Sequence, residues 1–189
     1  DFKALLSKPE DGPTDFFGPR AVAVDPSDRV WVSDTGNHRL LVYGSDGKFL
    51  KAIGQKGSGN LEFIEPFGVS FDSNGNAYVA DRLNFRIQVI NKAFGFVRAF
   101  KVDAWEAVQI NQEPYVAVDN ARSLVWISDP TKNKVLAYSF DGKKKNAYTQ
   151  GLVGGAETAF NLPTGLAVGP DGLIYVSDGG SGRILTIKP

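Results

Sequence analysis

The chain contains no cysteine and a single histidine among its 189 residues. The absence of cysteine excludes disulfides, zinc–thiolate sites and thiol nucleophiles together. The lone His38 has only carboxylates and carbonyls as potential partners in a metal site, so histidine-rich metal chemistry is excluded as well. The 21 basic and 21 acidic residues cancel. No large field of one sign is therefore available to attract nucleic acid or an anionic membrane.

Long apolar runs are also missing. No segment approaches the ~20 residues that a membrane-spanning helix needs, so we predict no membrane span in this chain. This prediction does not extend to the full-length protein, which can contain a membrane span elsewhere. The chain begins at Asp1 rather than methionine, which indicates processing or excision from a longer protein. Its 42% hydrophobic and 12% aromatic content is sufficient for one well-packed domain.

A short motif recurs four times along the chain. The segment "VWVSD" (30–34) returns as "AYVAD" (77–81), "VWISD" (125–129) and "IYVSD" (174–178). Each closing aspartate has a proline fifteen positions before it and a cation five positions after it. The aspartates are Asp34, Asp81, Asp129 and Asp178; the prolines are Pro19, Pro66, Pro114 and Pro163; the cations are Arg39, Arg86, Lys134 and Arg183. Agreement at this many offsets predicts four copies of one structural unit.

Each copy is predicted to form four short strands. In the first copy, apolar segments at 21–25, 30–34, 39–43 and 48–53 are separated by turn-forming residues. Apolar residues show no convincing helical spacing over eleven or more positions. Four antiparallel strands in a repeat of roughly 40 to 50 residues are typical of a β-propeller blade. We therefore predict an all-β fold, a β-propeller with four blades in this chain.

The whole chain, 1–189, is predicted to be a single propeller domain. Its blades are centred on 19–54, 66–101, 114–150 and 163–189. The last copy ends without a fourth strand, whereas residues 1–7 contain a sequence similar to the fourth strand of the first copy. We therefore expect the N-terminal strand to complete the last blade and close a four-bladed ring, since closure protects both sheet edges.

The second strand of each copy is apolar on both faces, as a sheet between two neighbouring blades requires. One position, three residues before the aspartate, is aromatic in every copy. These aromatic residues, which we predict to be core residues rather than a ligand-stacking ladder, are Trp31, Tyr78, Trp126 and Tyr175.

His38 lies close to Asp34 and beside Arg39, a cluster of the kind found in catalytic and metal sites. The aspartate and a cation five residues later recur in every copy, however. A strand-end aspartate can accept hydrogen bonds from the amides of the following turn and pair with that cation. We therefore interpret the four aspartates and their cations as structural and His38 as a loop residue, and we expect no catalytic residue, metal or cofactor.

Candidate contact residues come from the least repetitive part of the chain. The linker "VDAWEAVQINQE" (102–113) replaces a glycine-rich junction, and Trp105 within it is expected to be exposed. An exposed tryptophan beside carboxylate and amide side chains would suit a carbohydrate. The predicted binding residues are Trp105, Glu106, Gln109 and Asn111 in this linker, with His38, Arg39 and Phe85 in the turns.

The segments "VSDTGNHRLLVY" (32–43) and "VADRLNFRIQVI" (79–90) resemble NHL repeats, although only the first contains a histidine. The resemblance implies a propeller, more often of six blades, that serves as a binding platform for varied partners. The two C-terminal copies further resemble the C-terminal propeller of large bacterial membrane proteins with a glycosyltransferase-like region. That resemblance implies an extracytoplasmic appendage at the cell envelope, which binds a protein, a glycan or other copies of itself.

Three other functions are open to such a fold: a self-assembling structural protein, an RNA-binding domain and a metal-dependent hydrolase or lyase. Some NHL propellers bind RNA on a basic face, but the zero net charge does not favour nucleic acid here. The side chains that would contribute to such a face are the cations Arg20, Arg39, Arg82, Arg86 and Lys134 and the aromatic residues Phe67, Phe85 and Tyr115. Acidic residues are present for a calcium site, yet only the turn aspartates recur by blade. The absence of cysteine is compatible with an extracytoplasmic and with a cytoplasmic location of the protein.

Overall fold

The computed structural model describes residues 15–102, 105 and 113–189. Regular structure in these residues consists of β-strands and short 3-10 turns, and none of their helices is long and apolar enough to cross a membrane. The chain divides into two compact units, Asp1–Ala99 and Phe100–Pro189.

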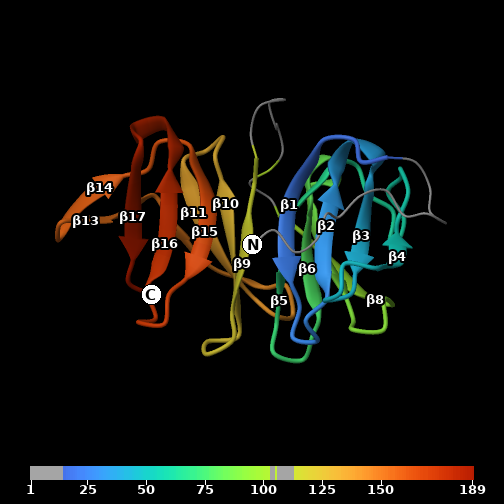
Figure 1. The fold of residues 1–189 in the computed structure, drawn as a ribbon. Coiled ribbons are helices and arrows are strands. Elements are labelled where there is room, and N and C mark those ends of the chain that lie inside the picture. The colour runs from blue at the N-terminus through green and yellow to red at the C-terminus, as the bar shows by residue number, and fades with distance from the viewer. Residues whose placement is uncertain (1–14, 103–104, 106–112) are drawn as a thin grey trace. The chain divides into compact units, whose positions relative to one another are not determined.

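The first unit contains two four-stranded antiparallel sheets, which appear in blue and green in Figure 1. The strands of the first sheet are β1 (Pro19–Val24), β2 (Val30–Asp34), β3 (Arg39–Tyr43) and β4 (Phe49–Ile53). Those of the second sheet are β5 (Pro66–Phe71), β6 (Ala77–Asp81), β7 (Arg86–Ile90) and β8 (Phe96–Lys101). In both sheets the strands pair in sequence order, as expected for propeller blades.

The second unit contains a four-stranded and a five-stranded sheet. The third sheet of the chain is built from β9 (Val116–Asp119), β10 (Leu124–Asp129), β11 (Lys134–Ser139) and β12 (Lys144–Tyr148). The fourth is built from β13 (Gln150–Val153), β14 (Ala156–Ala159), β15 (Pro163–Val168), β16 (Ile174–Asp178) and β17 (Arg183–Ile187), in the order β14-β13-β17-β16-β15. The all-β prediction with four NHL-type blades is confirmed at the level of these sheets.

The outer part of the fourth sheet was not predicted from the sequence. Strand β13 lies beside β17, with Leu152 opposite Thr186, and occupies the position predicted for residues 1–7. Residues 1–7 themselves lie outside the described part of the chain. Strands β13 and β14 form a hairpin through Gly154 and Gly155, both with positive φ, which is the geometry of a tight two-residue turn.

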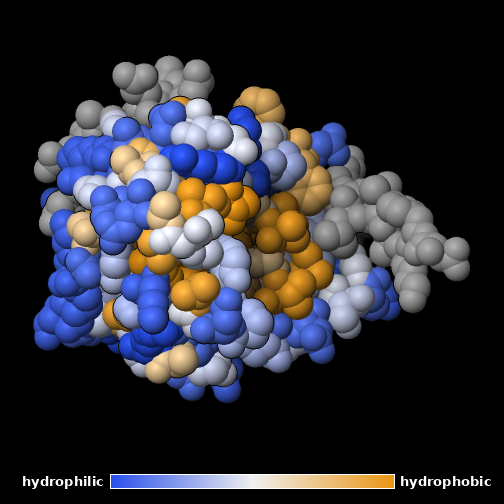
Figure 2. All heavy atoms as spheres, turned by 90° about the vertical axis from the view of Figure 1, so that its left-hand side faces the viewer, coloured by the Kyte–Doolittle hydropathy of each residue, from blue (hydrophilic) through white to orange (hydrophobic). Residues whose placement is uncertain are grey.

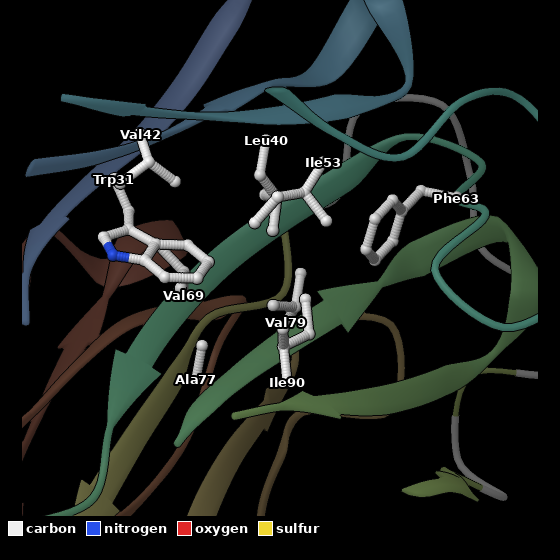
Figure 3. Packing of buried hydrophobic residues seen from close by; sticks show 9 residues of the cluster. All are labelled: Trp31, Leu40, Val42, Ile53, Phe63, Val69, Ala77, Val79 and Ile90. Carbon is white, nitrogen blue, oxygen red and sulfur yellow. The ribbon is translucent and has the colours of Figure 1, made fainter. Parts of the chain in front are cut away.

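The core of the first unit lies between its two sheets. Trp31, Leu40 and Val42 of the first sheet are fully buried. They point towards residues of the second sheet that include Val79 and Ile90 (Figure 3). Burying each of these side chains contributes roughly 1.5–3 kcal/mol, so this interface accounts for much of the stability of the unit.

The core of the second unit has the same arrangement. Trp126 of the third sheet packs against Ile174, Val176 and Leu185 of the fourth. The prediction of a core aromatic is therefore confirmed for Trp31, Tyr78 and Trp126, which are at most 2% exposed. It is wrong for Tyr175, which is 36% exposed because no other sheet covers this face among the described residues of the second unit.

Candidate functional site

The recurring aspartates lie at the ends of β2, β6 and β16, where each forms an ion pair with the arginine five residues later. The Nε–Oδ2 distances are 2.8 Å for Arg39–Asp34, 2.7 Å for Arg86–Asp81 and 2.9 Å for Arg183–Asp178. All three carboxylates are completely buried. A buried carboxylate paired in this way holds its own strand against the next one.

The same carboxylates also hold the loop that enters each blade. The amide of Phe17 donates to Asp34 Oδ1 at 2.7 Å, and that of Ile64 donates to Asp81 Oδ1 at 2.9 Å. Asn161 makes the equivalent bond to Asp178. Each of these aspartates therefore fixes the incoming loop, its own strand and the following strand, and it has little acceptor capacity left for a substrate.

The turn after each of these strands places one residue in the left-handed conformation. This residue lies four positions after the aspartate, and φ is 56° for His38, 56° for Phe85, 51° for Asn133 and 60° for Gly182. The short 3-10 helices η1 (Thr35–Asn37), η2 (Arg82–Asn84) and η4 (Gly179–Ser181) precede three of them. The backbone is thus nearly constant while the side chain changes from sheet to sheet.

His38 uses this position to connect two sheets. Its Nδ1 accepts a hydrogen bond of 3.1 Å from the amide of Glu65. Asn133 does the same in the second unit, where its Oδ1 accepts a 2.8 Å bond from the amide of Leu162. Because a histidine and an asparagine make the same bond at the same repeat position, His38 acts as a structural acceptor between neighbouring sheets.

Phe85 occupies the same position without a side-chain acceptor. It is 36% exposed, and a bulky side chain at positive φ is a genuine conformational outlier. The preceding Asn84 anchors the turn, since its Nδ2 donates to Asp81 Oδ2 at 2.9 Å and to the carbonyl of Gly57 at 2.8 Å. Strain of this kind persists only where the surroundings impose it, and it is concentrated at functional sites.

The loop beside this turn is held in place by polar contacts. Arg86 Nη2 donates to the carbonyl of Gly59 at 2.7 Å, and the amide of Gly59 donates to Glu62 Oε2 at 2.8 Å. The bond from this amide lowers the pKa of Glu62, which therefore stays ionised at neutral pH. We call residues 55–62 and 82–86 together the Phe85 surface.

An ion pair between a buried arginine and a partly exposed glutamate lies next to this surface. Arg82 Nη1 is 2.6 Å from Glu65 Oε2, and the Arg82 side chain is 2% exposed. Its guanidinium carbon lies 5.4 Å from the centre of the Phe67 ring, within cation–π range. Sequence reasoning missed this pair because the same repeat position carries Thr35, Pro130 and Gly179 in the other copies.

One of the predicted contact residues of the linker, Trp105, is buried rather than exposed. Trp105 is 2% exposed, and its Nε1 donates a 3.3 Å hydrogen bond to the carbonyl of Ser128. The expectation that Trp105 is exposed is wrong, because its large apolar ring is buried in the second unit. The other candidates in the linker, Glu106, Gln109 and Asn111, lie outside the described residues. Arg39, predicted among the contact residues, is 6% exposed and engaged by Asp34.

Asp129 departs from the pattern of the other aspartates. Lys134 stands where they have an arginine, and no side chain in the described part of the chain donates to Asp129 Oδ2. Burial raises the pKa of Asp129, although hydrogen bonding from the amide of Lys132 opposes this effect. The third sheet therefore contains a buried carboxylate that is poorly compensated.

The other acidic residues that the structure describes show no arrangement for metal binding. Across the described ranges, no group of three or more histidine, aspartate or glutamate side chains is placed to hold an ion. Asp25, in the first hairpin turn, accepts bonds from the amides of Ser27 and Arg29 and from Trp31 Nε1. Asp119 pairs with Arg122 at 2.9 Å. These carboxylates stabilise turns.

Residues 16–43 and 160–186 match the family model described as NHL repeat. These two segments are similar to NHL repeats. The matched segments contain the buried aspartates Asp34 and Asp178 together with their arginines. No curated protein matches the chain.

Solved structures share this fold at low sequence identity. A protein of unknown function from Bacteroides thetaiotaomicron is 23% identical, with a TM-score of 0.65, and the match covers 92% of this chain and 49% of that one. A chain in a nidogen–laminin complex is 16% identical, with a TM-score of 0.67 and coverage of 92% and 64%. Virginiamycin B lyase from Staphylococcus aureus is 14% identical, with a TM-score of 0.62 and coverage of 95% and 60%.

These similarities establish the fold alone. The chain spans 64% or less of the length of each of these proteins. One of them is a lyase and another is seen in a protein complex, so the shared fold supports both catalysis and binding in other proteins.

Proposed function

We propose that this chain is a non-catalytic binding module and that the Phe85 surface contacts a protein partner. The observation that carries the proposal is the conformation of Phe85. An aromatic side chain is held at φ 56° and remains 36% exposed, in a turn fixed by the hydrogen bonds of Asp81 and Asn84. This conformational cost has no evident benefit to packing, whereas a rigid, exposed aromatic ring is well suited to bind a partner.

The chemistry around Phe85 favours a protein partner. Aromatic residues are enriched in the centres of protein interfaces, and polar groups form their rims. The loop 55–62 supplies such a rim with Lys56 and the ionised Glu62 beside the backbone groups of Gly57 and Gly59. A chain of similar fold occurs in a nidogen–laminin complex, which supports protein binding as a use of this architecture.

The competing functions have less support. Arg39, Arg82 and Arg86 are committed to Asp34, Glu65 and Asp81, so few of the cations considered for RNA remain available. The carbohydrate hypothesis depended on an exposed Trp105, which is buried. A lyase shares the fold, but the buried carboxylates of Asp34, Asp81 and Asp178 are occupied by structural hydrogen bonds. Location at a bacterial cell envelope stays a prediction from the family resemblance.

The test is the affinity of the chain for the proteins that it retains from its native source. Asparagine is tolerated at positive φ and occurs at the equivalent position 133, so Phe85→Asn should keep the fold while removing the ring. We expect the variant to bind its partner at least about tenfold more weakly, which corresponds to about 1.4 kcal/mol. Leu50→Ala, which truncates an exposed residue on β4, is the control. Unchanged affinity of Phe85→Asn would exclude this surface.

A further inference from the structure

His38 takes part in its hydrogen bond as an acceptor. Its Nδ1 accepts the amide of Glu65 at 3.1 Å, so this nitrogen carries no proton while the bond exists. Imidazole is the side chain whose charge changes between about pH 5 and pH 8, and its protonated form has donors only. His38 is partly exposed, which gives solvent protons access to it. Protonation of His38 therefore breaks the bond to Glu65.

Most of the charged groups around His38 are already paired. The charged residues on the elements that adjoin it are Asp15, Asp34, Arg39, Glu65 and Arg82. Asp34 pairs with Arg39 at 2.8 Å, and Glu65 pairs with Arg82 at 2.6 Å. Asp15 contacts the turn of His38 through its backbone carbonyl, which accepts a bond from Asn37. The hydrogen bond at Nδ1 is thus the contact that protonation of His38 changes directly.

The segment that His38 holds also supports the Phe85 surface. The amide of Leu83 donates to the carbonyl of Ile64 at 3.1 Å. Glu65 forms the ion pair with Arg82, the first residue of η2. Both contacts join residues 64 and 65 to the turn that holds Phe85. Because the strained φ of Phe85 persists only while its surroundings impose it, loosening of this segment also loosens the ring.

We propose that His38 makes the Phe85 surface sensitive to pH, so that mild acid weakens its binding of a partner. The inference rests on the proposed function and adds its regulation. The loss of one hydrogen bond changes an equilibrium by a factor of about five. Apparent affinity falls with the fraction of chains in the binding-competent state, here by up to about fivefold. The stabilisation is present where the imidazole is neutral and is lost as the pH falls.

Amide hydrogen exchange tests this contact without a partner. Protection, the exchange rate relative to an unstructured peptide at the same pH, is compared at pH 7.5 and pH 5.5 in the wild type and in His38→Asn. We expect the protection of Glu65 and Leu83 to fall about fivefold in wild type at pH 5.5. It should stay constant in His38→Asn, because an amide oxygen accepts the bond at both pH values. Leu162, whose amide donates to Asn133, is the internal reference.

Three results of the exchange experiment would overturn the proposal. They are constant protection of Glu65 in the wild type, an equal loss of this protection in His38→Asn, and a loss at Glu65 that leaves Leu83 unchanged. The first two would show that protonation of His38 does not release the Glu65 amide. The third would show that the Phe85 turn does not respond to it.

The affinity for the retained partner tests the consequence. From pH 7.5 to pH 5.5, the wild type should lose up to about fivefold more affinity than His38→Asn, a comparison that cancels any titration of the partner itself. Figure 2 shows another area, on the side where β13, β14 and β17 lie in Figure 1, in which hydrophobic residues gather within a largely hydrophilic surface. His38, the chain's one histidine, belongs to the first unit, so a partner bound to that area would be held equally by both proteins.

The two proposals fail in different ways. Equal affinities of the wild type and His38→Asn at pH 5.5 would overturn the pH sensitivity, even where Phe85→Asn weakens binding. Unchanged affinity of Phe85→Asn at pH 7.5 would overturn the proposed function, and the regulation of partner binding with it, while the exchange experiment still decides whether His38 controls the Phe85 turn.

Discussion

Replacing His38 separates a structural histidine from a functional one. Its Nδ1 accepts the 3.1 Å hydrogen bond from the Glu65 amide, and Asn133 makes the same bond through an amide oxygen. His38→Asn should therefore preserve the bond and tolerate φ 56°, with a change in unfolding free energy within about 0.5 kcal/mol. His38→Ala removes the acceptor and leaves the half-buried Glu65 amide without it, which costs about 1 kcal/mol.

Urea unfolding followed by tryptophan fluorescence measures this difference, since Trp31 lies in the core of the first unit. With a typical m-value of about 2 kcal/mol per molar urea, the alanine variant should unfold at a urea concentration about 0.5 M lower than the wild type. The asparagine variant should unfold at nearly the same urea concentration as the wild type. Amide hydrogen exchange of Glu65 should accelerate only in His38→Ala. Equal destabilisation by both substitutions, or none by alanine, would refute the acceptor role.

Three further substitutions test the structural assignments. Asp81→Ala should lower stability by about 3–5 kcal/mol in denaturant titrations, because it leaves the largely buried Arg86 without its carboxylate. Asp46→Ala, which removes the carboxylate of the exposed ion pair with Lys48, should produce no measurable change. Burial raises the folded-state pKa of Asp129, so the contribution of this residue to stability falls as the pH rises above its unfolded-state pKa. Asp129→Asn should therefore raise the urea midpoint at pH 7 but not below pH 3. Equal effects of the substitution at the two pH values would contradict this. Trp105→Ala should cost about 3–5 kcal/mol of stability and leave partner affinity unchanged when measured on folded protein.

The repeat made the blades predictable because strand pairing and the aspartate–arginine bond both depend on local spacing. The predicted strands 30–34 and 39–43 agree with β2 and β3 to the residue. The hairpin β13–β14 was missed, although Gly154-Gly155 between two short strand segments is a recognisable two-residue turn signal. This hairpin lies largely between the third and fourth predicted blades, where the repeat predicts no strand.

The candidate site was less predictable because it depends on backbone conformation and on contacts distant in sequence. The positive φ at Phe85 is not evident from a phenylalanine, but Asn133 and Gly182 at the same repeat position are residues that favour it. The Arg82–Glu65 pair joins residues 17 positions apart on different elements, and no repeat signal marks it. Trp105 was taken as exposed because it lay outside the repeat, whereas its burial depends on packing that periodicity does not report.

Photo-cross-linking from position 85 tests the central claim most directly. A benzoylphenylalanine replaces Phe85 in one variant and Leu50, on β4 of the first unit, in a control, and both proteins are irradiated in the native source. The proposed function predicts that position 85 forms a covalent adduct with the protein that the wild type retains, and that position 50 does not. Adducts of equal yield from both positions, or none from position 85 while the partner is still retained, would contradict it.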